Sequence, residues 1–263
     1  MLLVLLNAGI MAASAGGGSD EDPDAAAYLN AVEVADGQAL ETAVRVAIND
    51  FVVGCKADGI WTAIKASCIL SGARTLSGAL VPLVGSAPTN FNFVSGDYNR
   101  ETGLLGNGST KYLDSNRAGN ADPQNNAHVS AFVTTVPTGS SWRLLGNGTV
   151  ETGVVLLSGT STVTLFRFKN PSATSVTGLI VANNLMGASR DNSNSYIYQV
   201  SGSGATINTA SQTPRSNNLL IYQSGGTYAN ARLSFYSIGE SLDLALLDSR
   251  VSALMAALDS AIP

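Results

Sequence analysis

The spacing of hydrophobic residues changes along the chain, and its first part has a helical period. Pro23 stands where a helix over 25–35 would begin, and a longer apolar stripe predicts a second helix over 40–58. The run 60–66 fits one further short helix. The stripe is formed by Leu40, Val44, Ala47, Ile48, Phe51 and Val52. We therefore predict a helical subdomain over 25–69 that faces a core.

From residue 70 onward, short apolar runs alternate with clusters of Gly, Asn, Ser and Pro. The candidate strands are 110–113, 128–135, 142–145, 153–157, 162–168, 177–182, 195–200, 219–223 and 232–237. Strands that follow one another with turn signals between them favour an antiparallel sheet over a parallel one with crossover helices. The sequence therefore predicts a mainly β protein whose central domain, 70–238, is a β-sandwich.

The last unit, 239–263, returns to a helical period, and the pattern places a helix over 238–262. Its apolar positions form one stripe: Leu244, Leu247, Val251, Leu254 and Leu258. The stripe is short for a coiled coil, which favours packing against the sandwich of the same chain. The alternative is a helix bundle between protomers, in which these residues would be assembly contacts.

Residues 1–24 form an apolar arm followed by a Gly-rich and acidic linker. The apolar part lacks the positive charge that leads a signal peptide. It is also shorter than the roughly 20 residues that cross a bilayer, so no membrane span is expected. We interpret it as an assembly arm in which Leu2, Leu3, Leu5 and Leu6 contact a partner.

Charge is scarce and unevenly divided. Only 13% of the residues are charged and the net charge is −5, which argues against nucleic-acid binding. Residues 117–239 hold seven bases and three acids, whereas the rest holds seven bases and sixteen acids. Scattered, solvated surface charge is the favoured interpretation. The alternative is complementary docking between neighbouring copies.

Groups that carry catalysis are few. The acids of 117–239 are Asp122, Glu151 and Asp191, so paired carboxylates for hydrolysis are not evident and no enzyme activity is expected. The only histidine, His128, is predicted to be a hydrogen-bonded structural residue. Cys55 and Cys68 could pair, but buried free thiols are favoured.

Two loops rich in side-chain oxygens are candidate sites. In the first, 114–126, Asp114 and Asp122 could serve Ca²⁺, which takes about six to eight oxygen ligands; turns satisfied by their own side chains are the favoured interpretation. No other cofactor is expected. The second loop combines amides, a carboxylate and aromatic rings suited to a sugar. Its candidate ligands are Asp191, Asn192, Asn194, Tyr196 and Tyr198. The alternative is that Tyr196 and Tyr198, which share one face of a strand, only cover the sheet.

Three segments carry a family resemblance. Residues 103–114 (GLLGNGSTKYLD) resemble the opening strand, and 231–243 (ARLSFYSIGESLD) the closing strand, of concanavalin A-like (laminin G-like) sandwiches in tailed-phage structural proteins. The lead-in over 51–83 and 90–97 is similar to what precedes such sandwiches. The resemblance covers 25 to the end of the sequence and implies a jelly-roll-like fold. The acid string of the glucanases in this family is missing here.

The resemblance implies a virion structural protein. The first hypothesis is a homotrimeric decoration (cement) subunit on the outer surface of a phage head, which binds the major capsid protein and adheres to host glycans. The second is a lectin-like receptor-binding module of a tail fibre or tailspike that recognises host polysaccharide. A secreted lectin or glucanase is the third.

Overall fold

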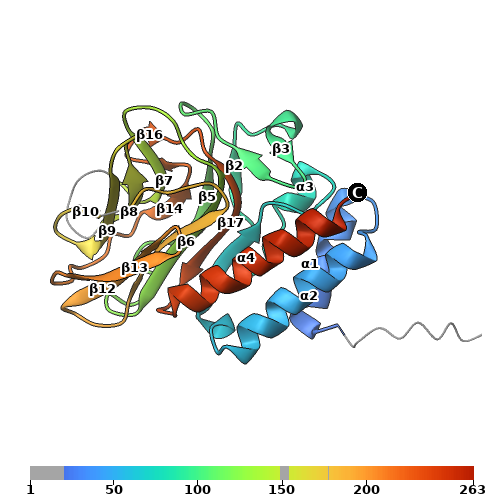
Figure 1. The fold of residues 1–263 in the computed structure, drawn as a ribbon, viewed down its shortest axis with the longest axis horizontal. Helices are drawn as coiled ribbons and strands as arrows, with labels where there is room; N and C mark the ends of the chain where they lie inside the picture. The colour runs from blue at the N-terminus through green and yellow to red at the C-terminus, as the bar shows by residue number, and fades with distance from the viewer. Residues whose placement is uncertain (1–20, 149–153, 177) are drawn as a thin grey trace, which may run out of the picture.

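The computed structural model describes residues 21–148, 154–176 and 178–263. Within them the chain forms a layer of helices, a middle sheet and an outer sheet (Figure 1). Every pairing between the described strands of the two large sheets is antiparallel. The predicted antiparallel β-sandwich with added helices is therefore confirmed.

The middle sheet has the order β13-β12-β11-β6-β17-β4-β3, and β1 also pairs with β17. Strand β17 is bordered by β6 on one edge and by β1 and β4 on the other, so it lies inside the sheet. The strands are β1 (Ile64–Ile69), β3 (Tyr98–Asn99), β4 (Gly103–Leu105), β6 (Ala127–Thr135), β11 (Asn184–Arg190), β12 (Ser195–Val200), β13 (Ser203–Asn208) and β17 (Arg232–Gly239).

The outer sheet has the order β10-β9-β8-β7-β14-β5-β2. Its strands are β2 (Thr89–Phe91), β5 (Tyr112–Ala118), β7 (Trp142–Gly146), β8 (Val154–Gly159), β9 (Thr164–Asn170), β10 (Thr174–Val176) and β14 (Asn218–Ile221). A separate small hairpin joins β15 (Gln223–Ser224) to β16 (Thr227–Tyr228).

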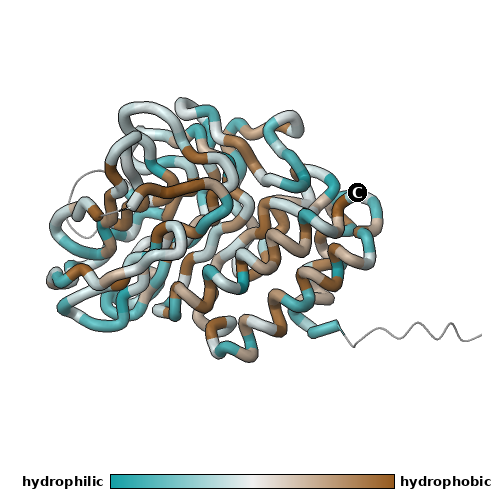
Figure 2. The backbone as a smooth tube through the Cα atoms, in the orientation of Figure 1, coloured by the Kyte–Doolittle hydropathy of each residue, from teal (hydrophilic) through white to brown (hydrophobic). Residues whose placement is uncertain are grey.

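The central strands of the middle sheet, β6, β11 and β17, are buried on both faces, because they separate two hydrophobic cores. On β17, Leu233 and Tyr236 point into the core between the sheets, whereas Phe235 points into the core beneath the helices. Figure 2 shows hydrophobic segments concentrated where the sheets and helices pack together. The sequence of a strand that is buried on both faces is a continuous apolar run, whereas a strand with one exposed face alternates apolar and polar residues.

The helices are α1 (Pro23–Asp36), α2 (Thr42–Ala57), α3 (Leu76–Ala79) and α4 (Leu244–Ala261), with 3-10 turns η1 (Trp61–Ala63) and η2 (Ser95–Asp97). Asp22 caps α1 by accepting from the backbone N–H of Asp24, and Gly37 ends it with a φ of 66°. Arg45 on α2 pairs with Glu33 on α1 at 2.7 Å. None of the described helices is both long and apolar enough to span a bilayer.

Helix α4 packs within its own chain. All five residues of its predicted stripe, from Leu244 to Leu258, are at most 3% exposed. Four of them share the helix-side core with residues of α1 and α2, and Arg250 pairs with Asp58 at 2.6 Å. These side chains are therefore not free to contact a second protomer. The alternative in which the stripe holds protomers together is wrong, because the stripe packs within its own chain. The other assembly residues, Leu2, Leu3, Leu5 and Leu6, lie outside the described residues.

Three predicted elements differ from the structure. Only 61–63 of the short helix predicted over 60–66 are helical, because 64–69 form β1 and pair with the long strand β17. Residues 178–182 form no strand; Gly178 has a φ of 99° and Asn183 one of 58°, which interrupts extended backbone before β11. The last helix begins at Leu244 rather than 238, since 232–239 complete β17.

His128 on β6 is buried and hydrogen-bonded, as predicted. Its Nδ1 donates to the carbonyl oxygen of Glu240 at 2.5 Å, and its Nε2 accepts from the hydroxyl of Ser237 at 2.7 Å. Burial lowers the pKa of His128 to about 4. Cys55 and Cys68 are both buried free thiols, and they lie in different cores.

Candidate functional site: a groove beside the start of helix α4

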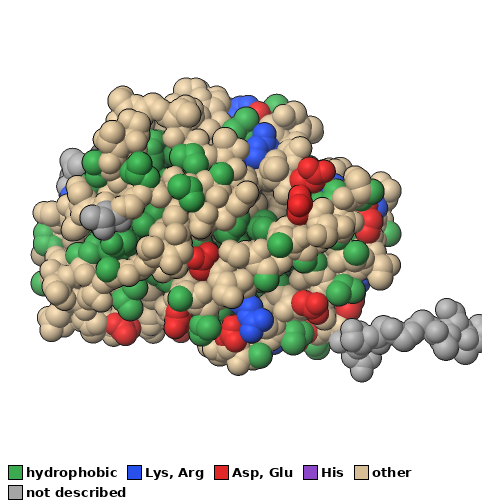
Figure 3. Space-filling model, viewed as in Figure 1, with side chains coloured by type: hydrophobic (Ala, Val, Ile, Leu, Met, Phe, Trp, Pro, Cys, Tyr) green, Lys and Arg blue, Asp and Glu red, His purple; other side chains and the backbone are tan. Residues whose placement is uncertain are grey.

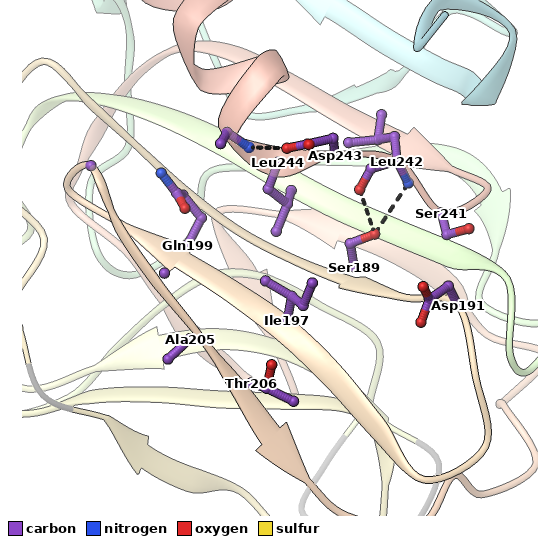
Figure 4. A pocket seen from close by; sticks show the side chains of 13 residues that line it. Ser189, Asp191, Ile197, Gln199, Ala205, Thr206, Ser241, Leu242, Asp243 and Leu244 are labelled. Atoms are coloured by element: carbon purple, nitrogen blue, oxygen red, sulfur yellow. Dashed lines mark hydrogen bonds between the residues drawn. The ribbon is translucent and has the colours of Figure 1, made fainter.

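A groove of about 670 Å³ lies where β12 and β13 extend past the helices (Figure 4). Its floor is the outer face of these two strands, and its wall is the segment 241–245 that leads into α4. The residues used below are Asp191, Ile197, Gln199, Gly204, Thr206 and Asp243. Figure 4 shows Ile197 between Gln199 and Asp191, which places an apolar side chain between polar ones.

Small residues on β13 produce the hollow. Gly204 lies opposite Gln199 in the strand pairing, and Thr206 lies opposite Ile197. A Cβ atom on Gly204 would stand 2.6 Å from Oε1 of Gln199 and 2.8 Å from the carbonyl oxygen of Tyr198. Any side chain at this position would therefore displace its neighbours and occupy the groove.

The wall of the groove is fixed by hydrogen bonds. Oδ1 of Asp243 accepts from the backbone N–H groups of Ala245 and Leu246, at 2.8 and 3.2 Å, and so caps α4. Ser189 on β11 donates to the carbonyl oxygen of Leu242 at 2.8 Å and accepts from its N–H at 3.1 Å. These bonds hold the wall against the sheet and define the width of the groove.

Asp191 stands at one end of the groove and is exposed. The loop that carries it is a turn in which Oδ1 of Asn192 accepts from the N–H groups of Asn194 and Ser195, at 2.8 and 2.9 Å. Asn192 also donates to Asp191 at 2.7 Å. Of the five predicted ligand residues, only Asp191 lines the groove.

The predicted aromatic platform is wrong. Tyr196 is 1% exposed and Tyr198 is 8% exposed, and both belong to the core between the sheets. Tyr196 packs edge-on against Phe168, with ring centroids 6.1 Å apart. Side chains alternate along a strand, so the face of β12 that meets the groove carries Ile197 and Gln199 instead.

Arg190 holds the Asp191 loop from inside the protein. Its guanidinium is fully buried and lies over the ring of Tyr196 at 5.1 Å. Nε donates to the carbonyl oxygen of Phe168 at 3.2 Å, and one Nη donates to that of Ser195 at 2.9 Å. The same Nη reaches the carbonyl oxygens of Asn192 and Thr209 at 3.3 Å. Burial lowers the pKa of Arg190.

Other basic residues of 117–239 are also directed inward. Lys169 is 2% exposed and donates to the carbonyl oxygens of Asp122 and Pro123, at 2.9 and 3.0 Å. Burial lowers the pKa of Lys169 to about 8. Arg167 is 6% exposed, and Arg143 donates to the carbonyl oxygen of Ser224 at 2.7 Å. Three of the seven bases of this stretch, Arg167, Lys169 and Arg190, are therefore buried, and neither surface interpretation applies to them.

The two carboxylates considered for Ca²⁺ are engaged by protein groups. Asp122 is 4% exposed and both of its carboxylate oxygens accept from Arg117. Asp114 accepts from the N–H of Asn116 at 2.8 Å and from the amide of Asn218 at 3.2 Å. These bonds agree with the turn interpretation of the loop.

No motif in the sequence predicted Gln199, Thr206 or Gly204 as residues of a site. The available signal was the run Ser201-Gly202-Ser203-Gly204-Ala205 directly after the predicted strand 195–200. Such a run of small residues beside a strand marks either a turn or a place where another molecule approaches the backbone. Asp243 in the wall of the groove is accounted for by its role as the cap of α4.

Comparison with known proteins gives a fold but no family. No family model and no curated protein matches this chain. A mutant of Trypanosoma rangeli sialidase that displays trans-sialidase activity is 12% identical, over 79% of this chain and 39% of that one, with a TM-score of 0.50. This chain thus spans well under half of the sialidase.

Two further structures are similar at lower scores. The binding domain of botulinum neurotoxin serotype D is 9% identical over 73% of this chain and 50% of its own, with a TM-score of 0.47. The CBM40 module of Ruminococcus gnavus IT-sialidase is 13% identical over 58% of this chain and 95% of its own, with a TM-score of 0.44. At these identities the sialidase match shows a lectin-like β-sandwich fold and nothing more.

Proposed function

We propose that this chain is a carbohydrate-binding module that does not cleave its ligand and that is displayed on the outer surface of a tailed-phage particle. The groove beside α4 carries the binding proposal. It combines a preformed hollow, an exposed apolar residue (Ile197) and convergent polar groups (Asp191, Gln199, Thr206), which is the composition that a sugar ring requires.

Binding without cleavage is supported by how the groove carboxylates are used. Glycoside hydrolysis employs one carboxyl group as a proton donor and a second as nucleophile or base. The groove holds Asp191 and Asp243, but Asp243 already accepts two backbone N–H bonds as the cap of α4. The helix cap alone accounts for a carboxylate at Asp243, and no catalytic role is needed to explain it.

Display on a virion is supported by the surface and by the segments that resemble phage sandwiches. On the face shown in Figure 3, the two sheets carry few charged side chains, and charged groups gather over and beside the helices. We propose a head decoration subunit that binds the major capsid protein and self-associates as a trimer. The tail-borne receptor-binding module is the alternative, because the same groove would serve there.

Blocking the groove tests the binding proposal. Thr206→Trp places a large side chain on the groove face of β13, and Ser203→Trp places the same side chain on the same strand outside the groove. Both positions are exposed, so folding is retained. On a glycan array, the Thr206→Trp protein should lose at least about tenfold in affinity, which corresponds to 1.4 kcal/mol. Equal binding by the two variants, or no binding by the unmodified protein, would contradict the proposal.

Locating the protein on purified particles tests the rest. Labelling with antibody and counting copies by quantitative mass spectrometry should give many copies over the head. A few copies confined to the tail would favour the receptor-binding alternative, and absence from particles would refute both.

A further inference from the structure

We infer that the groove selects saccharides that present hydrogen-bond donors, above all free amino groups, and rejects saccharides that carry a carboxylate. This inference deepens the proposed function and rests on it. The inference rests on the polar atoms of the groove that remain available to a ligand once the hydrogen bonds within the protein are made.

The available atoms are mainly acceptors. Asp191 is exposed at the groove end, and Asp243 uses Oδ1 for the helix cap, which leaves its second oxygen. Gln199 is 7% exposed, and its Nε2 donates to Asp248 at 3.0 Å. Because Asp248 needs a donor, this bond fixes the amide so that Oε1 points over Gly204. Oε1 accepts no hydrogen bond from the described residues.

Two of the three hydroxyl donors among the described residues that line the groove are already used. Ser189 donates to the carbonyl oxygen of Leu242 at 2.8 Å. Ser241 donates to Oδ1 of Asn126 at 2.6 Å. Thr206 is the remaining hydroxyl among the described lining residues. A ligand that offers only acceptors would therefore leave the carboxylates and Oε1 of Gln199 unpaired, which costs binding free energy.

The features that would attract an anion are absent or occupied. The described residues that line the groove include no Lys, Arg or His. Arg190 is adjacent in sequence, but its guanidinium is buried among carbonyl groups. The first N–H groups of α4, which could bind an anion, already donate to Asp243. A ligand carboxylate would meet Asp191 and Asp243 with no compensating charge.

An ammonium group on the ligand would be attracted by the same two carboxylates that repel a ligand carboxylate. Exposed ion pairs of this kind change affinity by about twofold to fivefold, and salt weakens them. We therefore expect a graded order of affinity: an oligomer of glucosamine with free amines first, its N-acetylated and uncharged counterpart second, and a sialylated oligosaccharide last.

The test compares these three ligands with the full chain, by calorimetry at mildly acidic pH in low and high salt. Asp191→Asn should lower the affinity for the amine oligomer about threefold more than it lowers that for the neutral oligomer, because only the amine loses an ion pair. Asp259→Asn, which changes an exposed carboxylate of α4 outside the groove, is the matched control.

Each outcome decides a separate point. Equal or tighter binding of the sialylated ligand would overturn the inference while leaving glycan binding intact. An amine preference that does not respond to Asp191→Asn or to salt would also overturn it. If none of the three ligands binds and the glycan array shows no binding either, the proposed function itself fails and the inference falls with it.

Discussion

A fall in pH should destabilise this protein through His128. The ring is fully buried on β6, between the carbonyl oxygen of Glu240 and the hydroxyl of Ser237. Nδ1 carries the proton, because a carbonyl oxygen can only accept. Ser237 in turn contacts Ser130 at 3.0 Å. Asp122 and Arg117 act on the ring from further away with opposite signs. The buried site therefore stabilises the neutral form of the imidazole over the protonated form.

The sign and size follow from the pKa values of the two states. His128 has a pKa of about 4 when folded and the ordinary value of 6.5 when unfolded. Between these values the unfolded chain binds more protons, so stability is complete above about pH 6.5 and is lost as pH falls toward 4. From about pH 7 to about pH 5 the loss is about 2 kcal/mol, and it approaches about 3.4 kcal/mol below the folded pKa, at 1.36 kcal/mol per unit.

Urea unfolding of the unmodified protein and of His128→Asn, across this pH range, measures the effect. Asn retains an N–H donor for Glu240 and cannot be protonated. Its absolute stability will be lower, but its stability should fall about 2 kcal/mol less between about pH 7 and about pH 5 than that of the unmodified protein. Parallel pH dependences for the two proteins would refute the reasoning.

Further predictions concern α4, the buried Arg190 and the pair of Glu41 with Arg100. Leu247→Ala removes a fully buried side chain of α4 and should lower the free energy of unfolding, measured in urea, by about 2–5 kcal/mol. A decrease of less than about 1 kcal/mol would contradict the packing of α4 against the core. Arg190→Lys should cost about 1–3 kcal/mol, because an ammonium cannot reach carbonyl groups on three sides; native stability with unchanged protease resistance of the Asp191 loop would refute the bracing role. Arg100 holds the pKa of Glu41 at about 2, so stability carried by Glu41 is present above pH 4.5 and lost as pH falls toward 2. Glu41→Gln should flatten that part of the acid unfolding curve, and an unchanged curve would contradict it.

The sequence predicted those elements whose local pattern agrees with their environment. The strand predicted over 195–200 matches β12, and α1 begins at Pro23 with a cap at Asp22. The α4 stripe was recognisable because leucines at helical spacing are buried on one face only.

The remaining elements depend on contacts far away in the sequence. Strand β1 resembles a helix extension locally, and only its pairing with β17, as between Cys68 and Tyr236, makes it extended. The candidate site was misplaced for a similar reason. Tyr196 and Ile197 differ by one position, and only the packing of the two sheets decides which of them faces the core. The local sequence does not reveal that Arg190 would be buried.

The position of β17 has a consequence for biosynthesis. This strand is shared by both cores, and its partners β1, β4 and β6 all precede it by roughly a hundred residues or more. On a translating ribosome these earlier segments emerge long before the strand that joins them. The nascent chain must therefore keep two incomplete apolar surfaces from aggregating until β17 and then α4, which completes the helix-side core, leave the exit tunnel. Chaperone dependence should be concentrated in that interval.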